Sequence, residues 1–145
     1  VKDSFISVRP GAGAFKYQTA QVVPDLPSRY SFALTACGVA ALCGAGEYSA
    51  PEVRQGLQYL WSWRPPRDIA PDRFDFYYGH YYAVQAAFQA GGAYWTSWYE
   101  AIKRDLLALQ QPDGSWNDLV GANYATAMAA IVLQLPNQYL PILEN

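Results

Sequence analysis

The segment from Asp75 to Tyr82 holds the side chains best suited to chemistry in this chain. It reads Asp-Phe-Tyr-Tyr-Gly-His-Tyr-Tyr and contains His80, the only histidine of the sequence. A carboxylate and an imidazole can both transfer protons, so Asp75 and His80 are the candidate catalytic residues. However, Arg73 precedes Asp75 by two residues, and a nearby guanidinium keeps a carboxylate ionised. We therefore expect a solvated loop charge at Asp75, and the sequence leaves the catalytic residues unknown.

The distribution of charge predicts the helices that position this segment. Residues 30–46, 76–99 and 119–143 carry no charged side chain if His80 is neutral, whereas charge recurs at helical spacing between them. An uncharged helix followed by an amphipathic one is typical of an inner layer covered by an outer layer. The pattern predicts an all-α protein with inner helices over 31–44, 76–90 and 123–135, and outer helices over 50–63 and 93–110.

The predicted inner helices are rich in alanine and glycine, and these small residues allow neighbouring helices to approach closely. The third inner helix also carries large side chains on one face, namely Tyr124, Met128, Ile131 and Leu135. In the second outer helix the apolar positions predict a buried stripe of Trp95, Trp98, Ile102, Leu106 and Leu109. The cysteines, Cys37 and Cys43, lie about 9 Å apart along the first inner helix at 1.5 Å rise per residue, so we expect two free thiols.

A two-helix unit repeats along the chain. Ser31 and Tyr78 are 47 residues apart, and Tyr78 and Tyr124 are 46 residues apart. A glycine-containing turn also recurs, at Gly13-Ala14-Phe15 before the first inner helix and at 114–116 before the third. Repeats of this length are typical of helical-repeat proteins, which stack their units to bury a continuous core. The units are 31–63, 76–110 and the half repeat 123–135, and they could form an open α-solenoid or close into a ring.

The turn after the second outer helix carries a more specific signal. Gln110 is followed by Pro112-Asp113-Gly114, in which each residue favours a tight turn, and then by Trp116. This combination resembles the QW repeat of squalene and oxidosqualene cyclases, and related turns occur in protein prenyltransferase β subunits. The resemblance covers about residues 12–135 and is strongest over 94–133. It implies that Gln110 stacks on Trp116 and ties an outer helix to the next inner helix.

The resemblance to the terpenoid cyclase and protein prenyltransferase superfamily implies an α/α toroid. This chain supplies about two and a half helix pairs of such a ring, and we predict that residues 1–145 form a single domain that is part of a longer toroid. In a cyclase, aromatic rings line the cavity and stabilise cations. The resemblance thus predicts ligand-binding residues at the starts of the inner helices: Tyr77, Tyr78, His80, Tyr81, Tyr82 and Tyr124. The alternative is that these aromatic side chains belong to the core.

The catalytic groups of the family are not recognisable. The acidic cluster of the cyclases is missing, and the zinc-binding histidine of the prenyltransferase motif falls on Tyr78. We expect no cofactor; the alternative is zinc held by Cys37 and His80, which requires the two side chains to face each other. We favour a structural role in which His80 forms hydrogen bonds with tyrosines.

Composition limits the partners. A net charge of −2 gives no attraction to nucleic acid, and aromatic residues reach 16% of the chain. No signal peptide or transmembrane helix is visible, so a soluble protein is expected, with its compartment unknown. Two further alternatives are shallow membrane contact through a Trp/Tyr face and self-association.

These observations predict a repeat domain, not an enzyme by itself, that binds an apolar small molecule or a protein partner. The alternatives are a fragment of a terpenoid cyclase or prenyltransferase whose catalytic residues lie elsewhere, and a structural helical repeat that docks a partner.

Overall fold

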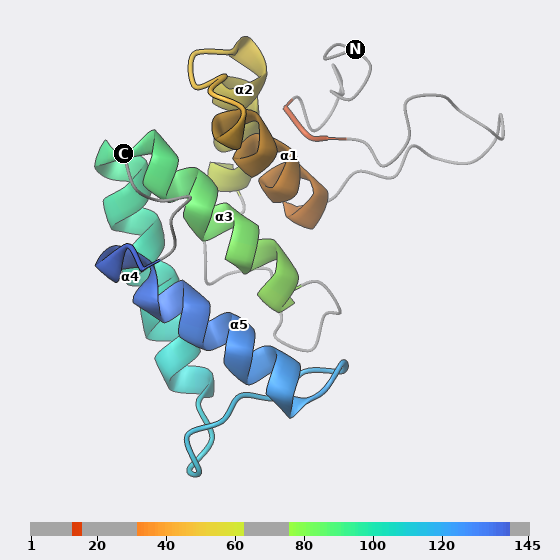
Figure 1. Cartoon of the computed structure of the whole chain (residues 1–145), viewed down its shortest axis with the longest axis vertical. Helices are drawn as coiled ribbons and strands as arrows, with labels where there is room; N and C mark the ends of the chain where they lie inside the picture. Colours follow the sequence, from red (N-terminus) through yellow and green to blue (C-terminus); the bar gives the residue numbers. More distant parts are fainter. Residues whose placement is uncertain (1–12, 16–31, 63–75, 140–145) are drawn as a thin grey trace, which may run out of the picture.

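The computed structural model describes residues 13–15, 32–62 and 76–139, and this part of the chain is helical (Figure 1). Each of the five predicted helices is confirmed, with bounds that agree to within one residue. In chain order they are α1 (Phe32–Gly44), α2 (Pro51–Ser62), α3 (Phe76–Ala90), α4 (Gly92–Leu109) and α5 (Ala122–Gln134), followed by the short 3-10 helix η2 (Leu135–Asn137). No helix among these is long and apolar enough to cross a membrane.

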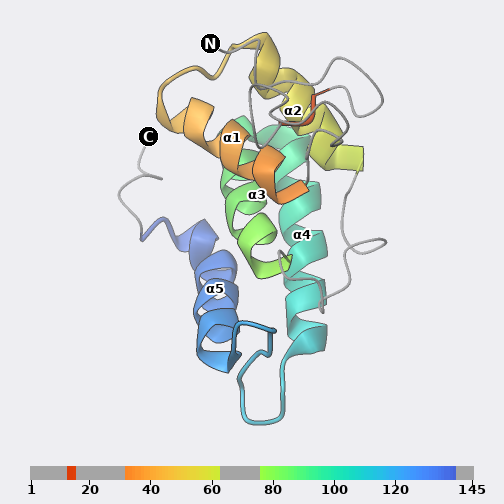
Figure 2. The ribbon, with the colours of Figure 1, turned by 90° about the vertical axis from the view of Figure 1, so that its right-hand side faces the viewer.

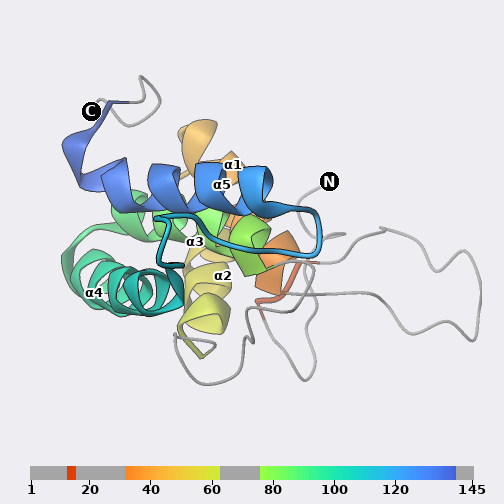
Figure 3. The ribbon, with the colours of Figure 1, turned by 90° about the horizontal axis from the view of Figure 1, so that it is seen from below.

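Helix α3 lies at the centre of the described structure. It packs against α1, α4 and α5, while α2 packs mainly against α1. Figure 2 shows α3 between α4 and α5, and Figure 3 shows α2 and α4 on one side of α3 with α5 on the other. The uncharged helices α1 and α5 therefore both pack against α3, and the amphipathic helices α2 and α4 cover one side of this layer.

Two glycines set the distances between these helices. A Cβ atom built on Gly79 of α3 would lie 2.7 Å from the ring of Phe32 at the start of α1. A Cβ atom on Gly56 of α2 would lie 2.3 Å from a methyl carbon of Val39. Contacts this short do not occur between real atoms, so α1 approaches both neighbours at points where only glycine fits.

Helix α5 buries its small side chains. Ala125 and Ala129 are fully buried and Val132 nearly so, whereas Tyr124 and Met128 are only partly buried. An uncharged helix is apolar all round, so its sequence pattern does not select the buried face. The alanine face allows closer approach to α3, and it leaves the larger side chains of α5 at the surface of the layer.

The outer helix α4 contributes the largest buried side chains. Trp98, Ile102 and Leu106 are almost fully buried, as the apolar stripe predicts, while Trp95 and Leu109 at its ends are half-buried. The indole of Trp98 stacks nearly parallel to the ring of Phe32, with ring centroids 5.9 Å apart. This contact joins α4 to the start of α1.

Replacing Gly79 by alanine tests the close approach of α1 and α3. The added methyl group overlaps the Phe32 ring, and overpacking of this kind costs about 1–3 kcal/mol against a helix-propensity gain of about 1 kcal/mol. We expect Gly79→Ala to lower the free energy of unfolding, measured by urea denaturation. Gly44→Ala is the matched control, because nothing lies within 4 Å of a Cβ atom there. Equal stability of the two variants would contradict the tight α1–α3 contact.

Candidate functional site

Four of the predicted ligand-binding residues gather on the face of the inner helices that is not covered by α4. Tyr78, Tyr81 and Tyr82 lie on α3 and Tyr124 lies on α5; we call these four residues the tyrosine face. The rings of Tyr78 and Tyr82 meet edge to face with centroids 5.0 Å apart, and those of Tyr81 and Tyr82 with centroids 4.8 Å apart. Tyr78 is exposed and the other three are partly buried, so ring faces and edges remain open to a ligand.

The hydroxyl groups of Tyr78 and Tyr124 keep their protons at neutral pH. Burial raises the pKa of Tyr78 to about 12, and interactions with Cys37 of α1 and with Tyr82 add to the shift. Burial also raises the pKa of Tyr124, with smaller contributions from the charge of Asp118 and from Tyr82. These mutual influences show that α1, α3 and α5 bring the groups close together. The face is uncharged and offers aromatic rings and phenolic hydroxyls.

The other two predicted ligand-binding residues are buried. Tyr77 meets the ring of Phe76 edge to face, and burial raises its pKa to about 12, with a smaller contribution from the charge of Asp118. His80 is 1% exposed. Along a helix, positions 78 and 82 lie roughly opposite position 80 at 3.6 residues per turn. A ligand on the tyrosine face therefore does not contact His80, which points toward α4.

His80 is enclosed by aromatic rings. Its ring centroid lies 5.1 Å from that of Phe32, 4.8 Å from that of Phe76 and 6.0 Å from that of Trp98. Among the described residues, neither imidazole nitrogen of His80 has a hydrogen-bond partner, and the Nε1 of Trp98 also has none. The predicted hydrogen bonds between His80 and tyrosines are therefore wrong, because the ring packs between apolar side chains of α1, α3 and α4. Burial lowers the pKa of His80 to about 3.

The structure gives His80 and Cys37 different surroundings. Cys37 is half-buried beside Tyr78, and both cysteines are free thiols, as predicted. Within the described ranges no group of three or more His, Cys, Asp or Glu side chains could hold a metal ion. Asp75, the other candidate catalytic residue, lies outside the described residues. Cys37 lies beside Tyr78, on the side of α3 roughly opposite His80, so the two proposed zinc ligands do not face each other.

The turn between α4 and α5 joins these two helices through Trp116. The indole Nε1–H donates to the Leu106 carbonyl of α4 at 2.7 Å, and the backbone N–H donates to the Thr126 hydroxyl of α5 at 3.0 Å. The turn itself is closed by the Gln110 amide, which donates to the Gly114 carbonyl at 2.9 Å. Gly114 has φ of +86°, a conformation that favours glycine. Trp116 therefore links the outer helix α4 to the inner helix α5, whereas the stacking of Gln110 on Trp116 that the QW resemblance implies stays a prediction.

Two hydrogen bonds of Asp113 shape the tip of the turn. Its carboxylate accepts from the Ser115 N–H at 3.0 Å and from the Ser115 hydroxyl at 2.7 Å. These bonds lower the pKa of Asp113. All four residues of the QW turn are thus accounted for by structural contacts, and none of these contacts is with the tyrosine face.

The glycine-containing turn before α1 makes the same contact as the turn before α5. The Phe15 N–H donates to the Thr35 hydroxyl of α1 at 3.0 Å, as the Trp116 N–H does to Thr126. Gly13, like Gly114, has a positive φ of +93°. A turn that ends in an aromatic residue and is held by an inner-helix threonine therefore occurs twice, which supports the repeat predicted from the sequence.

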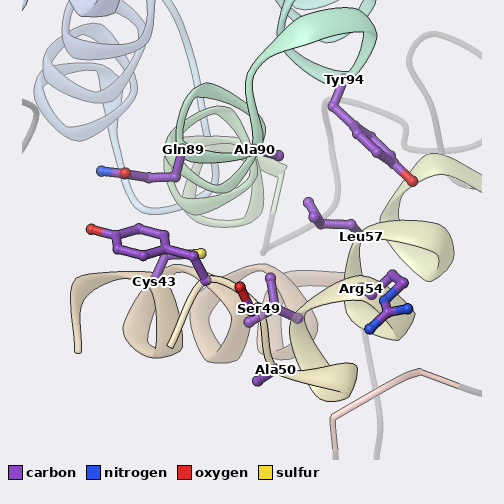
Figure 4. Close-up of a pocket in the computed structure, with 10 residues that line it drawn as sticks. Cys43, Ser49, Ala50, Arg54, Leu57, Gln89, Ala90 and Tyr94 are labelled. Atoms are coloured by element: carbon purple, nitrogen blue, oxygen red, sulfur yellow. The ribbon is translucent and has the colours of Figure 1, made fainter. Parts of the chain in front are cut away.

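A cavity elsewhere in the described structure was not predicted from the sequence. A cavity of about 410 Å³ opens where the end of α1, the start of α2, the end of α3 and the start of α4 meet. Figure 4 shows Ser49, Arg54 and Leu57 on the α2 side of this space, Gln89 and Ala90 on α3, and Tyr94 on α4. Arg54 lies on the polar face of α2, so the hydropathy pattern alone predicts that its side chain faces solvent.

No protein family model matches the chain, and neither the curated proteins nor the solved structures contain a match. The resemblance to terpenoid cyclases thus depends on the turn and on the helix repeat.

The buried His80 makes stability depend on pH. The imidazole titrates near 6.5 in an unfolded chain and near 3 in the folded protein, so the unfolded state binds the extra proton between these values. Stability that is fully present above pH 6.5 is therefore lost as the pH falls toward 3. At pH 5 we expect a loss of about 2 kcal/mol relative to pH 7, measured by urea denaturation.

His80→Phe is the control for this pH dependence. A phenyl ring suits the apolar surroundings and has no proton to bind, so this variant should lose less stability between pH 7 and pH 5. The carboxyl groups titrate alike in both proteins and cancel in the comparison. A pH dependence as steep as that of the wild type would contradict the assignment.

Trp116→Phe tests the link between α4 and α5. Phenylalanine keeps an aromatic ring but leaves the Leu106 carbonyl without its donor, and an unsatisfied buried group costs about 1–3 kcal/mol. We expect the urea midpoint to fall. The matched control is Trp95→Phe, since the half-buried Trp95 makes ring contacts with Phe88 and Tyr99 and no side-chain hydrogen bond within the described part. A larger loss for the control would argue against the link.

Proposed function

We propose that this chain is a binding domain of the terpenoid cyclase-like α/α toroid type, and that it binds an apolar small molecule on the tyrosine face. The observation that carries the proposal is the gathering of Tyr78, Tyr82 and Tyr124 from two inner helices on one uncharged surface. In this proposal the helices α1, α3 and α5 form part of the inner layer of the toroid and present the face to its cavity.

The chemistry of the tyrosine face favours an unsaturated hydrocarbon as the ligand. Aromatic rings offer polarisable apolar area, and their negative faces attract positive charge, while the hydroxyl groups can bond to an alcohol at one end of a chain. The Tyr78 and Tyr124 hydroxyls keep their protons, so these two groups offer no negative charge that would select a metal ion or an amine. An isoprenoid alcohol combines these properties with a length suited to several rings.

The face also extends along α5. Met128 is partly buried and follows Tyr124 by one helical turn, and a thioether adapts to irregular apolar ligands. Because α5 buries Ala125 and Ala129 instead, its larger side chains are available for binding. The choice of buried face on α5 thus supports the proposed site.

Docking of a protein partner is the second candidate function. Leu119 is 73% exposed and Val120 is 53% exposed, side by side in the connection that leads to α5. Neighbouring exposed aliphatic residues are a feature of interaction sites. This site is separate in sequence from Tyr78 and Tyr82, so substitutions distinguish the two functions.

Farnesol, a neutral isoprenoid alcohol, is the probe for the first function. We expect saturable binding of farnesol in detergent-free buffer, measured by the change in tryptophan and tyrosine fluorescence. Tyr82 contacts two other tyrosines of the face, so the Tyr82→Ala variant should bind farnesol about tenfold more weakly than the wild type does. Tyr82→Phe keeps the ring and should retain most of the affinity.

Tyr139→Ala is the matched control, because Tyr139 is 73% exposed and lies beyond η2. Its affinity for farnesol should equal that of the wild type. Equal affinity of Tyr82→Ala and Tyr139→Ala would contradict the proposed face, as would the absence of saturable binding to the folded protein. If Leu119→Ser with Val120→Ser instead abolished co-purification of a partner protein, the docking function would be favoured.

A further inference from the structure

The cavity at the junction of α1, α2, α3 and α4 has the size and shape of a small-molecule site. Its volume is about 410 Å³, within the roughly 300–1,000 Å³ typical of ligand pockets. It lies at the C-terminal end of α3, whereas Tyr78 and Tyr82 stand near the N-terminal end of that helix. The cavity is thus a site distinct from the tyrosine face, and the inference below does not depend on the proposed function.

The walls of this cavity are largely apolar. Val53 and Leu57 of α2 line it and are buried. Ala90 of α3 and Tyr94 of α4 lie across from Leu57 (Figure 4). At the rim, Tyr48 is 54% exposed, so its ring can cover a bound molecule. Apolar walls of this kind bind an alkyl or aryl body through burial of its surface.

Among the described residues of the lining, Arg54 is the one with a charged side chain. No described residue forms an ion pair or a hydrogen bond with its guanidinium, in contrast to Arg104, which pairs with Asp105 at 3.2 Å. The acidic side chains of α2 and of the preceding turn do not line the cavity. A guanidinium offers parallel N–H donors that match the two oxygens of a carboxylate.

The following polar groups on the lining carry no negative charge that would pair with the Arg54 guanidinium. The Cys43 thiol is buried, and burial raises its pKa, so it stays a neutral thiol at physiological pH. Ser49 and Tyr48 contribute hydroxyl groups, which accept or donate hydrogen bonds without charge. The cavity therefore combines an apolar interior with a single positive charge.

We propose that this cavity binds a small monocarboxylate with an apolar body, such as a medium-chain fatty acid. Arg54 binds the carboxylate by a bidentate pair, and the hydrocarbon lies against Val53, Leu57 and Ala90. The hydroxyl groups of Ser49 and Tyr48 add hydrogen bonds at the mouth.

Isothermal titration with octanoate tests the site, with octanol as the neutral ligand of the same chain length. The wild type should bind octanoate about tenfold or more tightly than octanol, because only the carboxylate forms the charge-assisted pair. Arg54→Gln should lower octanoate affinity by a similar factor and leave octanol affinity unchanged. Arg104→Gln removes an exposed, ion-paired arginine from α4 and should bind octanoate as the wild type does.

Filling the cavity provides a test that does not depend on charge. Ala90 is exposed at the last position of α3, so Ala90→Trp can place its ring in the cavity without disturbing the core. This variant should keep the helical circular dichroism of the wild type and lose binding of both octanoate and octanol. Equal affinity for the two ligands, an octanoate affinity unchanged in Arg54→Gln, or no saturable binding to the wild type would overturn the proposal. Farnesol binding should be unaffected by Ala90→Trp, which separates this site from the tyrosine face.

Discussion

The close packing of α1 on α3 is the constraint on which the described structure depends. Gly79 gives Phe32 room to lie against the α3 backbone, and Phe32 in turn stacks on Trp98 of α4. Three helices thus meet around one phenylalanine ring. Because α3 is held from both sides, its opposite faces acquire different roles: the His80 side belongs to the core, and the Tyr78 side remains open. The placement of every aromatic group on α3 follows from this packing.

Hydrogen bonds to threonine repeat at the points where the chain enters an inner helix. Thr35 and Thr126 each accept from the N–H of an aromatic residue that follows a glycine of positive φ. The aromatic ring then packs beside a neighbouring helix, and in Trp116 it also donates to the Leu106 carbonyl. Such contacts fix the angle at which the chain enters the inner helix, and they do not position a catalytic side chain. They supply the scaffold on which the tyrosine face and the cavity depend.

Much of this architecture could be predicted from the sequence because it follows from local rules. Charge periodicity located the helices, and turn chemistry located the glycine and proline connections. The tyrosines at 78, 81, 82 and 124 could be singled out by type and spacing. The surroundings of His80 could not, because a histidine flanked by tyrosines in sequence packs against rings from three different helices. Sequence neighbours and spatial neighbours differ there.

The sequence by itself determined an all-α chain, two free cysteines, the order of inner and outer helices, and a repeated turn. The tertiary structure alone decided which faces are buried. On α5 Ala125 and Ala129 are fully buried and Tyr124 only partly, because small side chains allow closer packing of helices that are apolar all round. The tertiary structure also decided that Arg54 stands at a cavity, since that space lies between residues 43–57 and residues 89–94, which are distant in sequence. Local patterns encode secondary structure, whereas a cavity exists only once helices pack.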